Sequence, residues 1–175
     1  KKVHKGRTFA NPRILICVPT GSTPVERKAI QDSAFAAGAR RVQLIEEPIA
    51  AAIGAGLPIS EATGSMVVDI GGGTSEIAVM SLGGLVYSKS LRVAGDAMDG
   101  ALVNYMRKEY NLMIGDSTAE KIKKEIGTAI PSNSNTYAVK GRDLRSGTPK
   151  EVNITEEDTA EALDGILREM VNGIK

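Results

Sequence analysis

The chain has 175 residues, of which 42% are hydrophobic, so it can bury the core of one domain or two small ones and is not expected to be disordered. Its 22 basic and 21 acidic side chains leave a net charge of +1, and aromatic residues make up 3%, so neither charge nor ring stacking favours nucleic-acid binding. The single cysteine, Cys17, excludes a disulfide framework, and no apolar run reaches the roughly 18 residues of a membrane-spanning helix.

The first part of the chain alternates strand and helix patterns, which is typical of a sheet with crossover helices. Cys17 lies in an apolar run and is expected to be a small core residue in a reducing compartment. Thr23 and Glu26 predict a capping box, with Pro24 at the first helical position. The predicted elements are strands at 12–18 and 42–45 and helices at 24–37 and 49–56.

Beyond residue 64 the pattern changes to three strands joined by glycine turns, which predicts an antiparallel meander. These strands are expected at 66–69, 75–80 and 85–93.

From about Asp96 the pattern becomes mainly helical, with apolar residues spaced at i, i+4 and i+8. Ser117 and Glu120 predict a second capping box, opening a helix that runs to about Ile126. Thr155 is expected to cap the last helix, which carries a continuous apolar stripe. Short strands are predicted at 136–139 and 151–154.

The segment Asp69-Ile70-Gly71-Gly72-Gly73-Thr74 is the most informative part of the sequence. A carboxylate ends a strand, and three glycines allow close backbone approach and positive φ. Backbone N–H groups in such a loop suit phosphate, and Asp69 suits a Mg²⁺ held through water. The alternative is a glycine-rich hairpin turn without a ligand. A Walker A loop and a Rossmann fingerprint are excluded, because no Gly-Lys-Ser/Thr follows and the glycines lead into a strand.

Glu47 stands at the start of a helix rich in small residues, next to Pro48. A carboxylate in this position can orient a water for attack on a γ-phosphate. The alternative is a glutamate that is favoured there by the helix dipole.

Taken together, several segments resemble the MreB family, the actin homologues that determine bacterial cell shape. The matching segments are 46–58 (EEPIAAAIGAGLP), 69–74 (DIGGGT) and 93–99 (VAGDAMD), with 25–30 (VERKAI) and 114–120 (IGDSTAE) in support. The resemblance covers essentially all 175 residues and roughly the middle half of the family's length.

The resemblance implies an α/β fold of the actin-like ATPase (ribonuclease H-like) kind, present in part as the end of the first lobe and most of the second. It also implies roles for individual residues. Glu47 and Thr74 match the pair that positions the attacking water, and Asp69 matches the carboxylate near Mg²⁺. Residues matching nucleotide-binding positions are Asp69, Gly71, Gly72, Gly73, Thr74, Gly95, Asp96, Glu120 and Lys123, with Lys124 as the alternative to Lys123. The predicted capping box is an alternative explanation for Glu120.

The function implied is that of an ATP-binding cytoskeletal protein that forms filaments in the cytoplasm, at the inner face of the bacterial membrane. Its implied partners are further copies of itself, the membrane surface and cell-wall elongation proteins, and it would direct rod shape and cell-wall synthesis. ATP turnover would be weak and linked to polymerisation. The alternatives are an Hsp70-type chaperone ATPase domain, which shares the Glu-Pro and Gly-Gly-Gly-Thr elements, and a filament subunit whose nucleotide is purely structural. A sugar kinase is less favoured, because no sugar-binding acidic loop is apparent.

The resemblance also implies four segments. Residues 1–60 would end the first large subdomain, 61–96 would begin the second, 97–155 would form an inserted small subdomain, and 156–175 would return to the second. The sequence begins at Lys1 without methionine and stops at Lys175 after a helical pattern, as expected of an internal fragment. The family's first phosphate loop and adenosine-side glycine motif would lie outside it, so these residues alone are expected to be inactive.

Phe9 is a candidate membrane contact, because it lies in a loop among basic residues that favour anionic lipid. The matching loop of the family is apolar and touches the inner membrane. A surface loop with a partly buried phenylalanine is the alternative.

Overall fold

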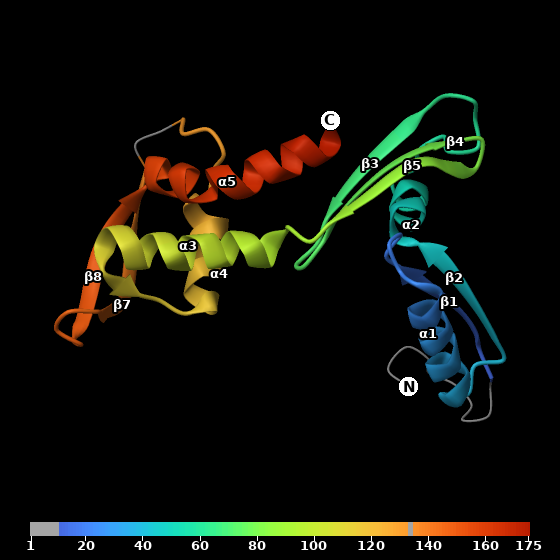
Figure 1. The fold of residues 1–175 in the computed structure, drawn as a ribbon, viewed down its shortest axis with the longest axis horizontal. Helices are drawn as coiled ribbons and strands as arrows, with labels where there is room; N and C mark the ends of the chain where they lie inside the picture. Colours follow the sequence, from blue (N-terminus) through green and yellow to red (C-terminus); the bar gives the residue numbers. More distant parts are fainter. Residues whose placement is uncertain (1–10, 133–134) are drawn as a thin grey trace. The chain divides into compact units, whose positions relative to one another are not determined.

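The computed structural model describes residues 11–132 and 135–175 (Figure 1). The described chain divides into two compact units. The first comprises the chain up to Asp69 together with Glu76–Ser90, and the second comprises Ile70–Ser75 and Leu91–Lys175. The four-segment assignment drawn from the resemblance stays a prediction. Phe9 lies outside the described residues.

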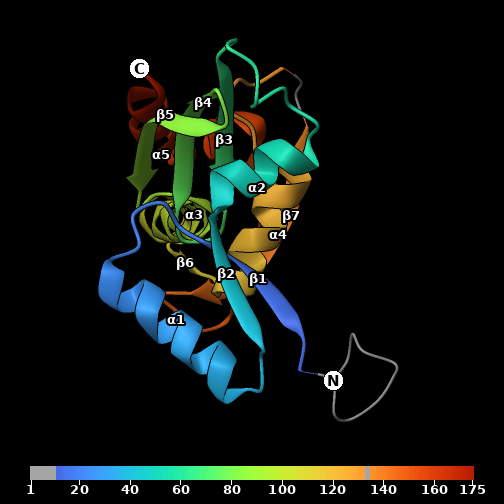
Figure 2. The same ribbon diagram turned by 90° about the vertical axis from the view of Figure 1, so that its right-hand side faces the viewer.

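The first unit opens with two parallel strands, β1 (Arg13–Val18) and β2 (Arg41–Glu46), joined by the crossover helix α1 (Pro24–Ala36). Figure 2 shows α1 lying alongside the two strands. The predicted capping box is confirmed: Thr23 Oγ1 accepts from the Glu26 amide, and the Glu26 carboxylate accepts from the Thr23 amide at 2.8 Å.

Cys17 is exposed, so the prediction that it is a core residue is wrong. Side chains alternate along β1, and Cys17 lies on the same face as Leu15, which is 63% exposed. The next residue, Val18, points the other way and is completely buried. The apolar run is therefore a strand with only one covered face among the described residues.

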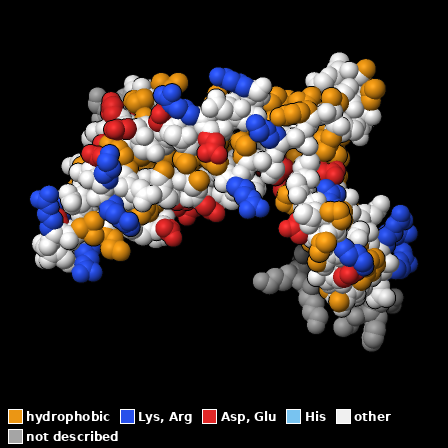
Figure 3. Space-filling view, in the orientation of Figure 1, with side chains coloured by type: hydrophobic (Ala, Val, Ile, Leu, Met, Phe, Trp, Pro, Cys, Tyr) orange, Lys and Arg blue, Asp and Glu red, His pale blue; other side chains and the backbone are white. Residues whose placement is uncertain are grey.

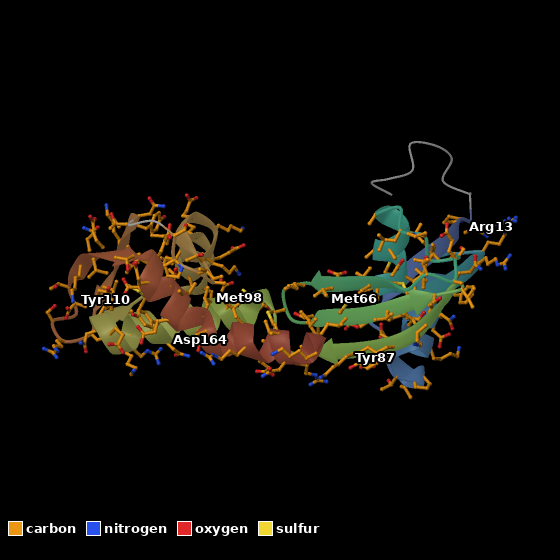
Figure 4. All side chains as sticks on the ribbon, turned by 90° about the horizontal axis from the view of Figure 1, so that it is seen from above. Arg13, Met66, Tyr87, Met98, Tyr110 and Asp164 are labelled. Carbon is orange, nitrogen blue, oxygen red and sulfur yellow. The ribbon has the colours of Figure 1, made fainter. Side chains whose placement is uncertain are left out.

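The second part of this unit is a sheet with the strand order β3-β4-β5, covered by helix α2 (Glu47–Gly54). Its strands are β3 (Ser65–Ile70), β4 (Ser75–Ser81) and β5 (Gly84–Leu91), which lie side by side in Figure 4. Connections this short make neighbouring strands antiparallel, as the meander prediction requires. The core between helix and sheet consists of Ala52, Ala78 and Met80, with Ile49, Leu57, Ile59, Val67 and Leu85 packed around it.

Among the described residues, the second unit contains three helices and a small sheet. Figure 1 shows α3 (Gly95–Tyr110) and α5 (Glu156–Ile174) side by side. The sheet has the order β6-β7-β8, with β6 at Leu112–Met113, β7 at Thr136–Asp143 and β8 at Pro149–Thr155. Helix α4 spans Asp116–Ile126. The core includes Leu102, Met106, Leu112, Ile122, Val139, Ile154 and Leu163.

The sequence predicted the start of one helix in this unit correctly and the start of another incorrectly. Thr155 caps α5 as predicted, through a capping box completed by Asp158. The capping box predicted at Ser117 is wrong, because α4 begins at Asp116 and its capping position is Gly115, two residues before Ser117 and without a side chain that could cap the helix. The two-residue strand β6 was not predicted, since it is too short to show a pattern.

Figure 3 shows basic and acidic side chains interspersed on the visible surface of the described residues. Among those residues no helix combines the length and apolar character that crossing a bilayer requires.

Candidate functional site

The glycine segment forms a tight hairpin between β3 and β4. The Gly71 amide donates to the Thr74 carbonyl at 2.9 Å, which closes a four-residue turn. None of Gly71, Gly72 and Gly73 has a positive φ, so this loop does not use the left-handed conformations that glycine allows. The reason for glycine here has to be space.

The atoms around the hairpin show how little space a side chain would have at Gly71 or Gly72. A Cβ on Gly71 would lie 3.3 Å from the Thr74 carbonyl oxygen. A Cβ on Gly72 would lie 3.3 Å from Asp96 Oδ1 and 3.6 Å from Oδ2. Contacts this short are tighter than most real Cβ contacts, so a side chain at either position would push the turn or Asp96 aside.

The start of α3 holds the hairpin in place. The Gly95 amide donates to the Gly71 carbonyl at 3.1 Å, and the Asp96 amide donates to the Gly72 carbonyl at 2.8 Å. The first two helical residues of α3 therefore use donors that a helix start normally leaves free. The resemblance placed Gly95 and Asp96 in a turn facing nucleotide. In this structure their backbone amides hold the glycine loop in place, and these two residues are called the mount of the hairpin below.

The hairpin keeps three successive donors available. Within the described residues, the backbone N–H groups of Gly72, Gly73 and Thr74 make no hydrogen bond. Successive free N–H groups in a tight turn form a concave site that suits phosphate oxygens. The loop therefore fits the ligand that its sequence predicts.

Lys123 connects α4 to this mount. Its Nζ donates to the Gly95 carbonyl at 3.0 Å and lies 2.8 Å from Asp99 Oδ1. The side chains are only 22% and 15% exposed, respectively. The ammonium thus neutralises a carboxylate of α3 and fixes the peptide that carries Asp96. Sequence reasoning identified Lys123 as a nucleotide contact but did not identify Asp99 as its partner.

Glu120 lies one turn away on α4 and pairs with Lys124 at 2.6 Å. This hydrogen bond and the charge of Lys124 lower the pKa of the Glu120 carboxyl below its usual value. Because the predicted capping box does not form, it no longer explains the presence of Glu120. The structure separates the two lysines: Lys123 is tied to the hairpin mount, whereas Lys124 is exposed beside Glu120.

A second group of candidate residues belongs to the first unit. Glu47 is the first residue of α2, and no side chain caps this helix start. Burial raises the pKa of the Glu47 carboxyl, and the negative charges of Glu76 and Asp69 raise it further. A favourable helix dipole would act in the opposite direction on this pKa, so burial and the two carboxylates outweigh it, and both the water-orienting role and the helix-dipole explanation of Glu47 stay predictions.

Asp69, near the end of β3, is half-buried. Among the described residues, no three His, Cys, Asp or Glu side chains gather in a way that could hold a metal ion. A Mg²⁺ bound through water to a single carboxylate needs no such group, so the role given to Asp69 stays a prediction.

Glu76 on β4 is a residue that sequence reasoning missed. It is 2% exposed, and its Oε1 accepts from Ser90 Oγ at 2.6 Å. The strand pattern offered a signal, because Glu76 is in phase with the core residues Ala78 and Met80.

The structure thus brings together the residues of one predicted group: the three glycines, Thr74, Gly95, Asp96 and Lys123 all belong to the second unit. Glu47 and Asp69 belong to the first unit, where they are joined by Glu76.

A strand–glycine–strand hairpin mounted on the following helix, after parallel strands with a crossover helix, defines an α/β protein of the actin-like class. Comparison with known proteins confirms this class. The family model described as MreB/Mbl protein matches residues 1–175, and the chain belongs to this family.

Individual relatives agree. The cell shape-determining protein MreB of Escherichia coli K12 is 53% identical over 176 residues, covering 99% of this chain and 51% of its own length. A crystal structure of MreB 5 of Spiroplasma citri bound to AMPPNP superposes with a TM-score of 0.89 at 39% identity, covering 93% of this chain and 49% of that one. The MamK double helical filament, at 19% identity with a TM-score of 0.72 over 94% of this chain and 50% of its own, shares the fold.

The chain spans about half the length of the curated relatives it matches. The predicted actin-like fold, present in part, and the predicted family are confirmed, and the comparisons do not favour the Hsp70-type alternative.

Proposed function

We propose that the protein carrying this chain is an actin-like, ATP-binding cytoskeletal protein that assembles into filaments and takes part in determining bacterial cell shape. The observation that carries the proposal is the glycine hairpin, held on α3 with three backbone donors free. The relatives named for cell shape, the structure with bound AMPPNP and the MamK filament support it.

In this proposal the hairpin amides of Gly72, Gly73 and Thr74 bind phosphate oxygens, and Lys123 keeps the mount of the hairpin rigid. Glu120 and Lys123 flank the adenosine, as the resemblance implies. A Mg²⁺ near Asp69 would neutralise phosphate charge. Glu47, whose raised pKa makes it a better proton acceptor, orients and deprotonates the attacking water together with Thr74.

Location belongs to the proposal as well. Filaments would lie in the cytoplasm at the inner membrane face, where they would guide cell-wall elongation proteins. The basic sequence segment around Phe9 is the proposed membrane contact.

The test uses the protein at its full natural length, with Mg-ATP. Binding is followed by titration of a fluorescent ATP analogue, turnover by phosphate release, and assembly by sedimentation with and without nucleotide. The proposal expects all three activities. Binding and assembly without release of the γ-phosphate would instead favour a filament subunit whose nucleotide is structural. Absence of nucleotide binding would overturn the proposal.

A further inference from the structure

Glu76 is a buried acid whose hydrogen bonding is incomplete. Its Oε1 accepts from Ser90, but Oε2 is buried and has no hydrogen-bond partner among the described residues. Buried polar atoms are nearly always paired, so an exception in a well-packed core calls for an explanation. Apolar side chains of similar size often replace buried charged groups without loss of stability, so stability alone does not require a carboxylate here.

The strand pattern shows which way Glu76 points. Residues two apart on a strand face the same side, so Glu76 faces the same side as Ala78 and Met80. Those two side chains form the core with Ala52 of α2. Glu76 therefore lies under the face of the sheet that α2 covers. On β3, Asp69 faces this side too, since it is two residues from Val67, which packs in the same core.

The path of the chain shows which end of α2 lies near Glu76. Beyond the helix, the Ile59 carbonyl accepts from the Gly83 amide at 2.7 Å, and the Glu61 carbonyl accepts from the Leu82 amide at 2.9 Å. The segment after α2 thus meets the far end of β4. The middle of α2 packs at Ala78, so its first residue, Glu47, lies toward Glu76 at the near end.

The charges around Glu47 are mainly negative. Burial is the largest cause of the raised pKa of Glu47, and the negative charges of Glu76 on β4 and Asp69 on β3 raise it further. The preceding residue, Glu46, is already paired with Arg27 of α1 at 3.1 Å. The remaining charges of β1 and β2 are Arg13 and Arg41, at the opposite ends of these strands, and Lys89 of β5 is exposed. Lys89 is four residues from Leu85 on β5 and so faces the same side of the sheet, but within the described residues no basic side chain forms an ion pair with Glu76.

We propose that Glu76 is a positioning residue that acts through Glu47, its buried negative charge making Glu47 a stronger acceptor for the proton of the hydrolytic water. This inference rests on the proposed ATPase function. In the step concerned, water gives one proton to the Glu47 carboxylate while its oxygen bonds to the γ-phosphorus. The bond from that phosphorus to the β,γ-bridging oxygen breaks, and its electron pair leaves on ADP.

The test is the pH dependence of ATP turnover in the full-length protein with Glu76 unchanged or as Glu76→Gln. Glutamine keeps the size and can still accept from Ser90, but it removes the charge. Activity requires ionised Glu47 and so rises with pH through the pKa of that group. Removing Glu76's charge lowers this pKa, so the acid limb should move down by about half a pH unit or more. The plateau kcat should fall roughly 2- to 10-fold, because a weaker base is a poorer acceptor. KM should not change.

Two further variants keep the test decisive. Glu76→Met, which needs no hydrogen-bond partner, covers the case in which glutamine prevents folding, and it should shift the acid limb in the same direction. Glu61→Gln removes an exposed carboxylate from the same unit and should leave the profile unchanged. Turnover with the same acid limb in the Glu76 variants and the parent would overturn the role of Glu76 alone. Absence of turnover in the parent would overturn the proposed ATPase function, and this inference with it.

Discussion

Lys123 of α4 and Asp99 of α3 form an ion pair of 2.8 Å in which neither side chain is more than 22% exposed. The same Lys123 Nζ donates to the Gly95 carbonyl, and the Gly95 amide donates to Gly71 in the hairpin. One side chain therefore links two helices to the loop that carries the proposed phosphate donors. Rigidity of this loop depends on a charge outside it.

Replacing Lys123 with methionine should destabilise the second unit by about 2 kcal/mol, because it leaves the largely buried Asp99 without its counter-ion. In nucleotide-free, full-length protein, urea unfolding measures this change, and amide hydrogen exchange over residues 91–99 should speed up as the mount loosens.

The matched control is Lys124→Met, which breaks a pair whose lysine is 66% exposed. It should change stability by less than about 0.5 kcal/mol. Equal effects of the two substitutions would show that the Lys123–Asp99 pair is no stronger than a surface pair.

Gly72→Val should abolish nucleotide binding. The new Cβ would lie 3.3 Å from Asp96 Oδ1, so valine must displace either the turn or the start of α3 that holds it. Titration with a fluorescent ATP analogue measures the loss. Gly64→Val, at a glycine with open space around it, is the control and should bind as the parent does.

Much of the fold could be predicted from local patterns, because the signals were local. The capping boxes at Thr23 and Thr155, the alternation in β4 and the glycine hairpin all depend on residues within a few positions of each other. The family-specific motifs then identified the hairpin as a candidate phosphate loop.

The rest depended on distant pairs, which a single sequence does not reveal. The spacing of Asp99 and Lys123 in the sequence does not indicate that they form an ion pair between two helices. Cys17 looked like core because an apolar run does not show which strand face is covered. Glu76 was passed over because its partner, Ser90, is on another strand and its effect is on a third element, α2.

Gly141→Ala should destabilise the small sheet of the second unit. A Cβ there would lie 2.5 Å from the Met113 carbonyl oxygen and 2.8 Å from Leu112 Cγ, so β6 would have to move off β7. Overpacking of this kind typically costs about 1–3 kcal/mol. Gly100→Ala, in α3 with open space around it, should instead stabilise by about 0.5–1 kcal/mol. Chemical unfolding of both variants measures the difference. A Gly141→Ala variant as stable as the parent would contradict the close packing of β6 against Gly141.

The stability of the second unit should depend on Asp158 in acid. Burial opposes its ionisation, but hydrogen bonds from the Thr155 amide and from the hydroxyls of Tyr105 and Tyr110 lower the pKa of Asp158 overall. A carboxyl whose folded pKa is below its unfolded value of 3.8 adds stability above that value and loses it as pH falls through the folded pKa.

Asp158→Asn should therefore be less stable than the parent at pH 6, and the gap should narrow as pH falls below about 4. Urea midpoints between about pH 2 and pH 6 measure it. A gap that stays constant over this range would mean that the charge of Asp158 adds nothing beyond its hydrogen bonds.

Glu47→Ala should separate nucleotide binding from turnover. Alanine removes the carboxylate that accepts the proton but leaves the hairpin amides untouched, and alanine is well tolerated in a helix. Loss of acid–base help typically slows a reaction about 10²- to 10⁴-fold. Phosphate release by the full-length variant should fall by this factor while the affinity for a fluorescent ATP analogue stays within about 2-fold of the parent's.

Glu61→Ala, which removes an exposed carboxylate of the same unit, should leave both values unchanged. Turnover equal to the parent's would assign the proton acceptor to another group, and the raised pKa of Glu47 would then reflect burial beside Glu76 and Asp69 without a role in the reaction.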